Sequence, residues 1–220
     1  KKSMEKIIFD FLNELKTNNN RGWFQANKSS YEKAKKSFES FIDELIPVIR
    51  GIDPNIDLIT AKDCVFRIYR DVRFSHDKSP YKTNMGAYIT RGGKSSPMAG
   101  YYVHFEPGGS FLAGGIYMPQ PDVLKKIRDE VFYKYDEFRK IIEDNEFVKT
   151  FGQIDDDQKL KSPPRGYPKD FTGIELLKFR NYAVMHFVSD EMALSEKFPE
   201  YARKVFKTLY PLNSFFNNVF

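Results

Sequence analysis

The sequence predicts a protein of the α+β class: one domain in which an antiparallel meander sheet of about five strands packs against amphipathic helices. Hydrophobic residues recur at helical spacing toward both ends of the chain, whereas they alternate with the period of a strand in its middle. Short links that contain glycine and proline join the predicted strands, which favours antiparallel pairing of neighbours. No internal repeat or low-complexity linker divides the 220 residues, a length that suits one domain.

We expect that domain to fill residues 1–220 in three parts. The parts are a helical region at about 1–60, a central sheet at about 64–117, and C-terminal helices with one further strand at about 120–220. The 21 phenylalanines and 13 tyrosines supply bulky apolar material for one core, so disorder is not expected despite 30% charged residues.

Two helices are predicted in the N-terminal region. Residues 4–17 place apolar side chains at helical spacing, and a run of asparagines then ends the helix. A longer amphipathic helix is predicted over about 28–49, with Asn27 as its N-cap. Between the two helices stand Trp23 and Phe24, which we expect either to fill the core beside the turn or to wall a ligand pocket.

Five runs have the pattern of β-strands. They are residues 65–69, 85–90, 100–106, 110–117 and 182–188. The single cysteine, Cys64, directly precedes the first run, and we expect a small buried side chain there rather than a catalytic thiol. One cysteine also excludes an internal disulfide and fits a reducing compartment.

Helical patterns return after the central strands. They predict helices at about 120–144, at 147–151 with a stop at Gly152, weakly at 169–179, from Ser189 onward, and at 197–209. A polar stretch at 155–165 is expected to form a surface loop, and Pro211 is expected to interrupt the last helix.

The positive charge of the chain is concentrated in one central stretch. Between Lys62 and Lys94 there are eight basic and three acidic residues, so the surplus of this stretch equals the net charge of +5 of the whole chain. The rest of the chain is therefore balanced. This concentration argues for a local anionic partner rather than for general attraction to acidic molecules.

The predicted site lies in that stretch, where cations alternate with aromatic residues. Guanidinium groups bind phosphate or carboxylate through two parallel hydrogen bonds, and lysines add point charges. Asp71 and Asp77 neutralise part of the charge, and the remainder predicts a pocket for a small phosphorylated or carboxylated ligand. The expected ligand-binding residues are Arg67, Arg70, Arg73, Lys78, Lys82, Tyr69, Tyr81 and Trp23.

Three other interpretations of these residues stay open. In one, internal salt bridges hold the loop to the sheet, and the protein is an interaction module whose basic loop is only structural. In another, the protein is an enzyme acting on a phosphate-containing substrate. Its acid or base would be Asp77, Glu106 or His104, and the last two project from one face of a strand. In the third, nucleic acid is the partner, which is disfavoured because no extended basic face is expected.

Metal, cofactor and membrane functions are not expected. Three scattered histidines and one cysteine form no cluster of metal ligands, and the glycine motifs that bind phosphates or dinucleotides are missing. No stretch approaches the roughly 20 apolar residues that span a bilayer. The first residues lead into an amphipathic pattern rather than into the apolar block of a signal peptide. We therefore expect a cytoplasmic protein without a cofactor or a membrane partner.

The central stretch also resembles a known family signature. Residues 66–86 read FRIYRDVRFSHDKSPYKTNMG and are similar to the signature of the DUF2461 family, a group of bacterial and fungal proteins of unknown function. Shorter matches are Arg21-Gly22-Trp23-Phe24 followed by Asn27-Lys28, Gly100-Tyr101-Tyr102 with His104-Phe105, and Gly114-Gly115-Ile116-Tyr117 followed by Pro119. The resemblance spans nearly the whole chain. It implies a single-domain fold and brings no assigned catalytic residues.

Overall fold

Four antiparallel strands form one sheet at the centre of the protein. The computed structural model describes residues 4–154, 156 and 158–220, and within them the chain forms ten helices and this sheet. The strands are β1 (Met85–Ile89), β2 (Gly100–Phe105), β3 (Phe111–Ile116) and β4 (Tyr182–Phe187), in the spatial order β1-β2-β3-β4. All three pairings are antiparallel, so the predicted meander and the α+β class are confirmed.

The predicted strand at 65–69 is the one strand that the structure does not form. Val65 makes an isolated bridge with Ala87 of β1, whereas Tyr69 makes one with Tyr81. The two ends of this run therefore pair with different segments, and no continuous ladder arises. The sheet accordingly has four strands rather than about five.

The N-terminal helices are α1 (Met4–Thr17), α2 (Arg21–Ala26), α3 (Lys28–Arg50) and α4 (Ala61–Cys64). The first and third agree with the predicted helices. Trp23 and Phe24 lie in helix α2 rather than in a turn, because the Asn20 side chain accepts a hydrogen bond from the Trp23 N–H (2.9 Å) and caps a new helix. Asn27 stands at the N-cap of α3 as predicted, but its side-chain amide donates to the Trp23 carbonyl (2.9 Å) instead of capping.

The C-terminal helices are α5 (Pro121–Tyr133), α6 (Tyr135–Ile142), α7 (Asn145–Phe151), α8 (Ile174–Leu177), α9 (Asp190–Ala193) and α10 (Phe198–Asn217). The helix predicted at 120–144 is divided at Lys134, whose backbone leaves the helical region (φ −116°, ψ 39°). Helix α8 is shorter than the run predicted at 169–179. Residues 155 and 157 of the expected loop at 155–165 lie outside the described residues.

Pro211 does not interrupt the last helix, contrary to the prediction from sequence. Helix α10 continues through it, and the buried side chains Leu209, Leu212, Phe215 and Phe216 lie on both sides of the proline. Proline removes one backbone hydrogen bond of a helix. Burial of each such side chain stabilises the fold by roughly 1.5–3 kcal/mol, so packing on both sides outweighs that loss.

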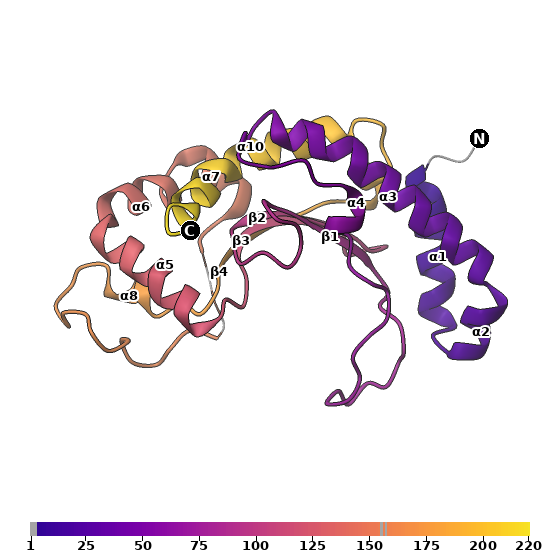
Figure 1. The fold of residues 1–220 in the computed structure, drawn as a ribbon, viewed down its shortest axis with the longest axis horizontal. Helices are drawn as coiled ribbons and strands as arrows, with labels where there is room; N and C mark the ends of the chain where they lie inside the picture. Colours follow the sequence, from indigo (N-terminus) through magenta and orange to yellow (C-terminus); the bar gives the residue numbers. More distant parts are fainter. Residues whose placement is uncertain (1–3, 155, 157) are drawn as a thin grey trace.

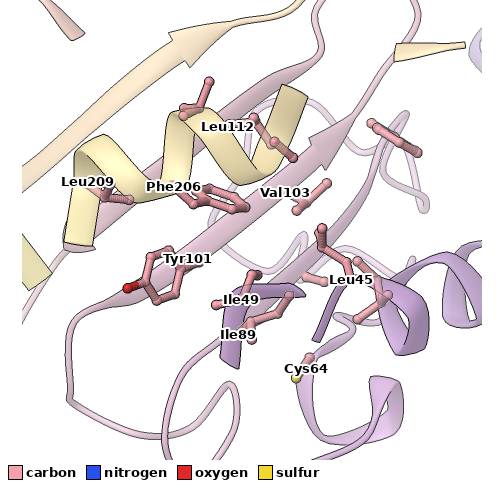
Figure 2. Close-up of a cluster of buried hydrophobic side chains, with 14 of the residues drawn as sticks. Leu45, Ile49, Cys64, Ile89, Tyr101, Val103, Leu112, Phe206 and Leu209 are labelled. Carbon is pink, nitrogen blue, oxygen red and sulfur yellow. The ribbon is translucent and has the colours of Figure 1, made fainter. Parts of the chain in front are cut away.

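The core lies between the sheet and the two long helices. Figure 1 shows α3 and α10 along one face of the sheet, with the other helices at its two sides and no helix of the described chain across the opposite face. Figure 2 shows Tyr101, Val103 and Leu112 of the covered face packed against Leu45 and Ile49 of α3 and Phe206 and Leu209 of α10. Cys64 is fully buried in the same cluster, as predicted.

Helix α10 approaches β3 closely because a glycine stands at the contact. A Cβ atom at Gly114 would lie 2.2 Å from a methyl carbon of Leu209. One turn further along the helix, the buried Asn213 accepts from the Gly115 N–H and donates to the Gly100 carbonyl (both 2.9 Å). Side chain and backbone thus fix α10 to the sheet. None of the described helices combines the length and the apolar character that a membrane crossing requires.

Candidate functional site

Residues 65–84 leave the edge of the sheet as a long irregular hairpin, which we call the basic hairpin. Figure 1 shows it projecting from the sheet on the side away from α3 and α10. Backbone hydrogen bonds hold its two arms together near the base, from the Phe66 N–H to the Gly86 carbonyl (2.9 Å) and from the Lys82 N–H to the Ile68 carbonyl (2.8 Å). We call residues 70–79 its tip. The predicted ligand-binding residues are divided between the base and the tip, where their surroundings differ.

An aromatic stack anchors the arms of the hairpin to helix α2. Tyr81 is buried and stacks on Phe24, with ring centroids 3.9 Å apart, and Tyr69 lies 5.5 Å from Tyr81. The Asn19 side chain bonds both the N–H (3.1 Å) and the carbonyl (2.9 Å) of Tyr81. The structure thus brings Tyr69 and Tyr81 together. Trp23 is not in this stack.

Phe24 takes the place that the sequence analysis gave to Trp23. Trp23 turns toward Phe11 instead, at 6.2 Å between ring centroids. Neighbouring residues of a helix point about 100° apart, so only one of an adjacent aromatic pair faces a given partner. A prediction of a helix at 21–26 would have shown that the two rings face different partners.

The cations of the tip are engaged within the hairpin itself. Arg70 pairs with Asp77 and also donates to the Ser79 carbonyl (3.2 Å). Arg73 donates two hydrogen bonds to the Asp71 carboxylate, at 3.0 and 2.7 Å. The Lys78 ammonium donates to the Val72 carbonyl (3.0 Å). The structure therefore does not bring these three cations to one cavity.

Asp77 is held as an ionised carboxylate at the tip. It accepts hydrogen bonds from the Ser79 hydroxyl (2.6 Å) and N–H (2.9 Å). These bonds, followed by the bond from Arg70, lower the pKa of Asp77 to about 2. A general base poised for neutral pH has a pKa close to that pH. The position of Asp77 thus suits a structural role better than the catalytic one that the sequence left open.

A groove of about 660 Å³ lies between α3 and the base of the basic hairpin. Its charged lining residues are Lys35, Glu39, Lys62, Arg67 and Lys94, and its aromatic ones include Tyr31, Phe66 and Tyr69. We call it the basic groove. Four cations and one carboxylate line it, which leaves it positively charged.

Arg67 differs from the arginines of the tip in its surroundings. It lies between the two isolated bridges of the hairpin base, and within the described residues its guanidinium has neither a hydrogen bond nor an ion pair. Lys35 lies 3.8 Å from Glu39, and Lys94 donates to the Lys62 carbonyl (2.8 Å). The groove therefore keeps a cation without a hydrogen-bonded partner at its hairpin wall, and the Asp71 carboxylate reaches that cation only through its charge.

A chain of hydrogen bonds crosses the sheet face that the helices leave uncovered. The Tyr102 hydroxyl lies 3.0 Å from Nδ1 of His104, and Nε2 of His104 lies 3.1 Å from Oε2 of Glu106. The Thr83 hydroxyl donates to Oε1 of Glu106 (2.7 Å). We call Tyr102, His104 and Glu106 the relay. The structure thus brings His104 and Glu106 together on one face, as the alternation along the strand predicts.

Lys82 stands between the groove and the relay. Its ammonium lies over the Phe66 ring, 5.6 Å from the centroid. Burial, and then the charge of Arg67, lowers the pKa of Lys82. Burial also lowers the pKa of His104, and together with the charge of Lys82 it outweighs the hydrogen bond and charge of Glu106, which raise that pKa. His104 is therefore neutral at neutral pH.

Within the residues that the structure describes, no group of three or more His, Cys, Asp or Glu side chains is placed to hold a metal ion. A family model described as a conserved hypothetical protein (DUF2461) matches residues 7–215.

The chain belongs to the DUF2461 family.

No curated protein and no solved structure matches this chain. The groove and the relay of this DUF2461 protein both lie inside the matched residues.

Sequence reasoning missed the part of the groove that other segments supply. Tyr31 and Lys35 come from α3, Lys62 from α4, and Lys94 from the loop after β1. Periodicity assigns polar residues of a helix to its solvent face and cannot tell which of them line a groove. Tyr102 and Thr83 were also missed. Tyr102 was within reach of sequence reasoning, because it shares the strand face of His104 and Glu106 by alternation.

Proposed function

We propose that this DUF2461 protein binds a small ligand with a phosphate or carboxylate group in the basic groove. The observation that supports this best is the unpaired guanidinium of Arg67 beside Lys62 and Lys94. Uncompensated cations that share a groove repel one another, and a bound anion relieves that repulsion. After burial, the charge of Arg67 lowers the pKa of Lys82, a cation that lies beside the groove rather than in its lining.

The groove also has the size and lining of a small-molecule site. Its volume of about 660 Å³ lies within the range of such sites in proteins, roughly 300–1,000 Å³. Tyr31, Phe66 and Tyr69 supply aromatic surface beside the cations, so we propose that the ligand carries a ring or an apolar group as well as its anion. Arg67 would hold the anion through paired hydrogen bonds.

The other predicted binding residues take supporting roles in this proposal. Arg70, Arg73 and Lys78 would stabilise the tip, and Tyr81 would anchor the arms behind the groove. Lys82 would add positive charge next to Arg67. We infer a cytoplasmic location, and this is supported by the single cysteine, Cys64, which is free and buried.

One alternative also has an observation in its favour. The ion pairs of Arg70 with Asp77 and of Arg73 with Asp71 are what a purely structural basic loop would contain. Under that alternative the protein is an interaction module, and no small anion protects it. The two functions therefore differ in a thermal-shift experiment.

The test compares phenyl phosphate, inorganic phosphate and phenol as added ligands, with the melting temperature as the readout. Binding to the folded state alone stabilises it by RT ln(1 + [L]/Kd), about 2.7 kcal/mol at a concentration 100-fold above Kd. We expect phenyl phosphate to raise the melting temperature most, inorganic phosphate less, and phenol least. Arg67→Ala should abolish the rise, whereas Arg73→Ala, a matched arginine that is already paired, should keep it.

The proposal fails if neither phosphate raises the melting temperature of the wild-type protein. It also fails if Arg67→Ala retains the full rise while remaining folded by circular dichroism.

A further inference from the structure

The relay on the uncovered sheet face contains a defined order of donors and acceptors. An ionised carboxylate only accepts hydrogen bonds, so Glu106 requires a proton on Nε2 of His104. Nδ1 of neutral His104 is then without a proton and accepts the hydrogen bond of the Tyr102 hydroxyl. A hydroxyl, a base and an orienting carboxylate follow one another, which is the arrangement that activates hydroxyl nucleophiles. Burial, followed by the charge of Glu106, raises the pKa of Tyr102 to about 12, so His104 has to take the proton as the new bond forms.

The surroundings hold this arrangement in place. The His104 ring stacks on Phe111, with centroids 4.3 Å apart, and is nearly buried. The Thr83 hydroxyl fixes the second oxygen of Glu106. A Cβ atom at Gly86 would lie 2.4 Å from the Tyr102 hydroxyl, so only glycine leaves room for that oxygen above β1.

The same face offers a place for an apolar substrate. Phe187 is 74% exposed and Met185 is 43% exposed on β4. In register, Phe187 pairs with Phe111 and Phe111 with His104, so the exposed apolar surface continues directly from the relay. The charges of Lys82 and Glu106 act on His104 with opposite signs, which favours an uncharged electrophile.

We propose that Tyr102, His104 and Glu106 form a second site, in which the Tyr102 oxygen is a nucleophile toward uncharged, apolar carboxylic esters. The Tyr102 oxygen bonds to the ester carbonyl carbon, and its proton passes to Nδ1 of His104. The bond from that carbon to the leaving oxygen breaks, and the leaving group takes the proton from His104. Water, with His104 as the base, then hydrolyses the tyrosyl ester and restores the phenol. This site does not depend on the basic groove.

The chain contains a matched control for this geometry. Nδ1 of His186 lies 2.7 Å from the Thr150 carbonyl, and its Nε2 lies 2.5 Å from the Tyr201 hydroxyl. Tyr201 therefore also donates to a histidine, but a neutral carbonyl stands where Glu106 stands in the relay. This second pair lies on the helix-covered side of the sheet, where β4 meets α7 and α10.

The test uses p-nitrophenyl acetate and mass-spectrometric mapping of acetylated tyrosines. We expect a burst of nitrophenol close to one equivalent per chain, with the acetyl group on Tyr102. Tyr117 and Tyr133 are 70% and 78% exposed and serve as controls for simple accessibility. They and Tyr201 should be acetylated at least tenfold more slowly than Tyr102.

Variants show whether acetylation of Tyr102 depends on activation by His104 and Glu106 or only on the exposure of its side chain. Tyr102→Phe should abolish the burst, whereas Tyr201→Phe should keep it. His104→Gln should slow the burst at least tenfold. Glu106 is a positioning residue, and Glu106→Gln should both slow the burst and move its pH midpoint lower. Loss of the carboxylate makes protonated His104 less stable, while Tyr102 and Lys82 still face that ring.

Several results would overturn the proposal. They are acetylation of the exposed tyrosines ahead of Tyr102, an unchanged burst in Tyr102→Phe, or an unchanged rate in both folded His104→Gln and Glu106→Gln. The burst is measured with p-nitrophenyl acetate and binding in the groove with phenyl phosphate, so failure of the relay and failure of the groove are distinguishable.

Discussion

Arg73, at the tip of the basic hairpin, and Arg67, at its base, have opposite electrostatic surroundings. Arg73 makes two hydrogen bonds with Asp71, an acid two positions away in the same turn. Within the described residues Arg67 has no hydrogen-bonded acid. Asp71 acts on it only through its charge, and Arg67 shares the basic groove with lysines from other segments. Both arginines belong to one continuous motif, so their sequence neighbourhood alone does not distinguish them.

The difference shows where free positive charge arises in this fold. Within a tight turn, an acid a few positions away reaches the cation, and the charge is neutralised locally. At the base of the hairpin, the chain is extended between two bridges, and the neighbours of a side chain come from distant elements. Those neighbours are mostly lysines, so the charge persists. The groove rather than the tip is therefore the region to test for anion binding.

The largest effect is expected from a substitution that removes the anchor shared by the base and the tip of the hairpin. Phe24 is 1% exposed and stacks on Tyr81 at the arms of the hairpin. Phe24→Ala should lower the free energy of unfolding by about 3–5 kcal/mol, because it leaves a cavity in the core. Urea denaturation measures this change. Phe74→Ala is the control, because Phe74 is 96% exposed at the tip. It should change stability by less than about 0.5 kcal/mol.

Equal effects of these two substitutions would contradict the anchoring role of Phe24.

A smaller effect is expected from the one acid of the basic groove. Glu39→Gln removes a negative charge beside the proposed anion and releases Lys35 from its partner. Affinity for phenyl phosphate should therefore rise, by about 0.2–1 kcal/mol, as is usual for exposed charge pairs. Isothermal titration calorimetry measures the affinity. Glu44→Gln, an exposed position of α3 outside the groove, should leave it unchanged, and a fall in affinity with Glu39→Gln would count against the groove.

The smallest expected effect is the loss of stability of the hairpin tip at acidic pH. The pKa of Asp77 is about 2 in the folded protein, below its ordinary value of 3.8, so the ionised form stabilises the folded hairpin. This contribution is complete above about pH 4 and is lost as the pH falls through about 2. NMR signals of the tip amides should follow that titration in the wild-type protein but not in Asp77→Asn. A midpoint at the ordinary value would contradict the bonds from Ser79 and Arg70.

Local periodicity predicted most of the fold. The four strands and helices α1, α3, α7 and α10 follow from spacing alone. The division at Lys134 and the continuation of α10 through Pro211 did not, because tertiary packing decides whether a helix breaks or tolerates a proline. Residues 65–69 have the composition of a strand, but their partners are split between β1 and the other arm of the hairpin.

The candidate site was predicted only in part, again because tertiary packing decides which side chains meet. Charge counting found the stretch that holds Arg67, and alternation placed His104 beside Glu106. Neither method gives ion pairs or distant neighbours. The pairing of Arg70 with Asp77 depends on how the tip folds back, and the lysines of the groove depend on how α3 and α4 pack against the hairpin base.

NMR of arginine side chains, during a titration with phenyl phosphate, shows directly whether the anion binds at the base or at the tip of the basic hairpin. Each guanidinium Nε–Hε group gives its own signal, so Arg67 can be followed beside Arg70 and Arg73 in one experiment. We expect the Arg67 signal to shift saturably while those of Arg70 and Arg73 stay in place. Saturable shifts of the tip arginines with an unmoved Arg67 signal would contradict it.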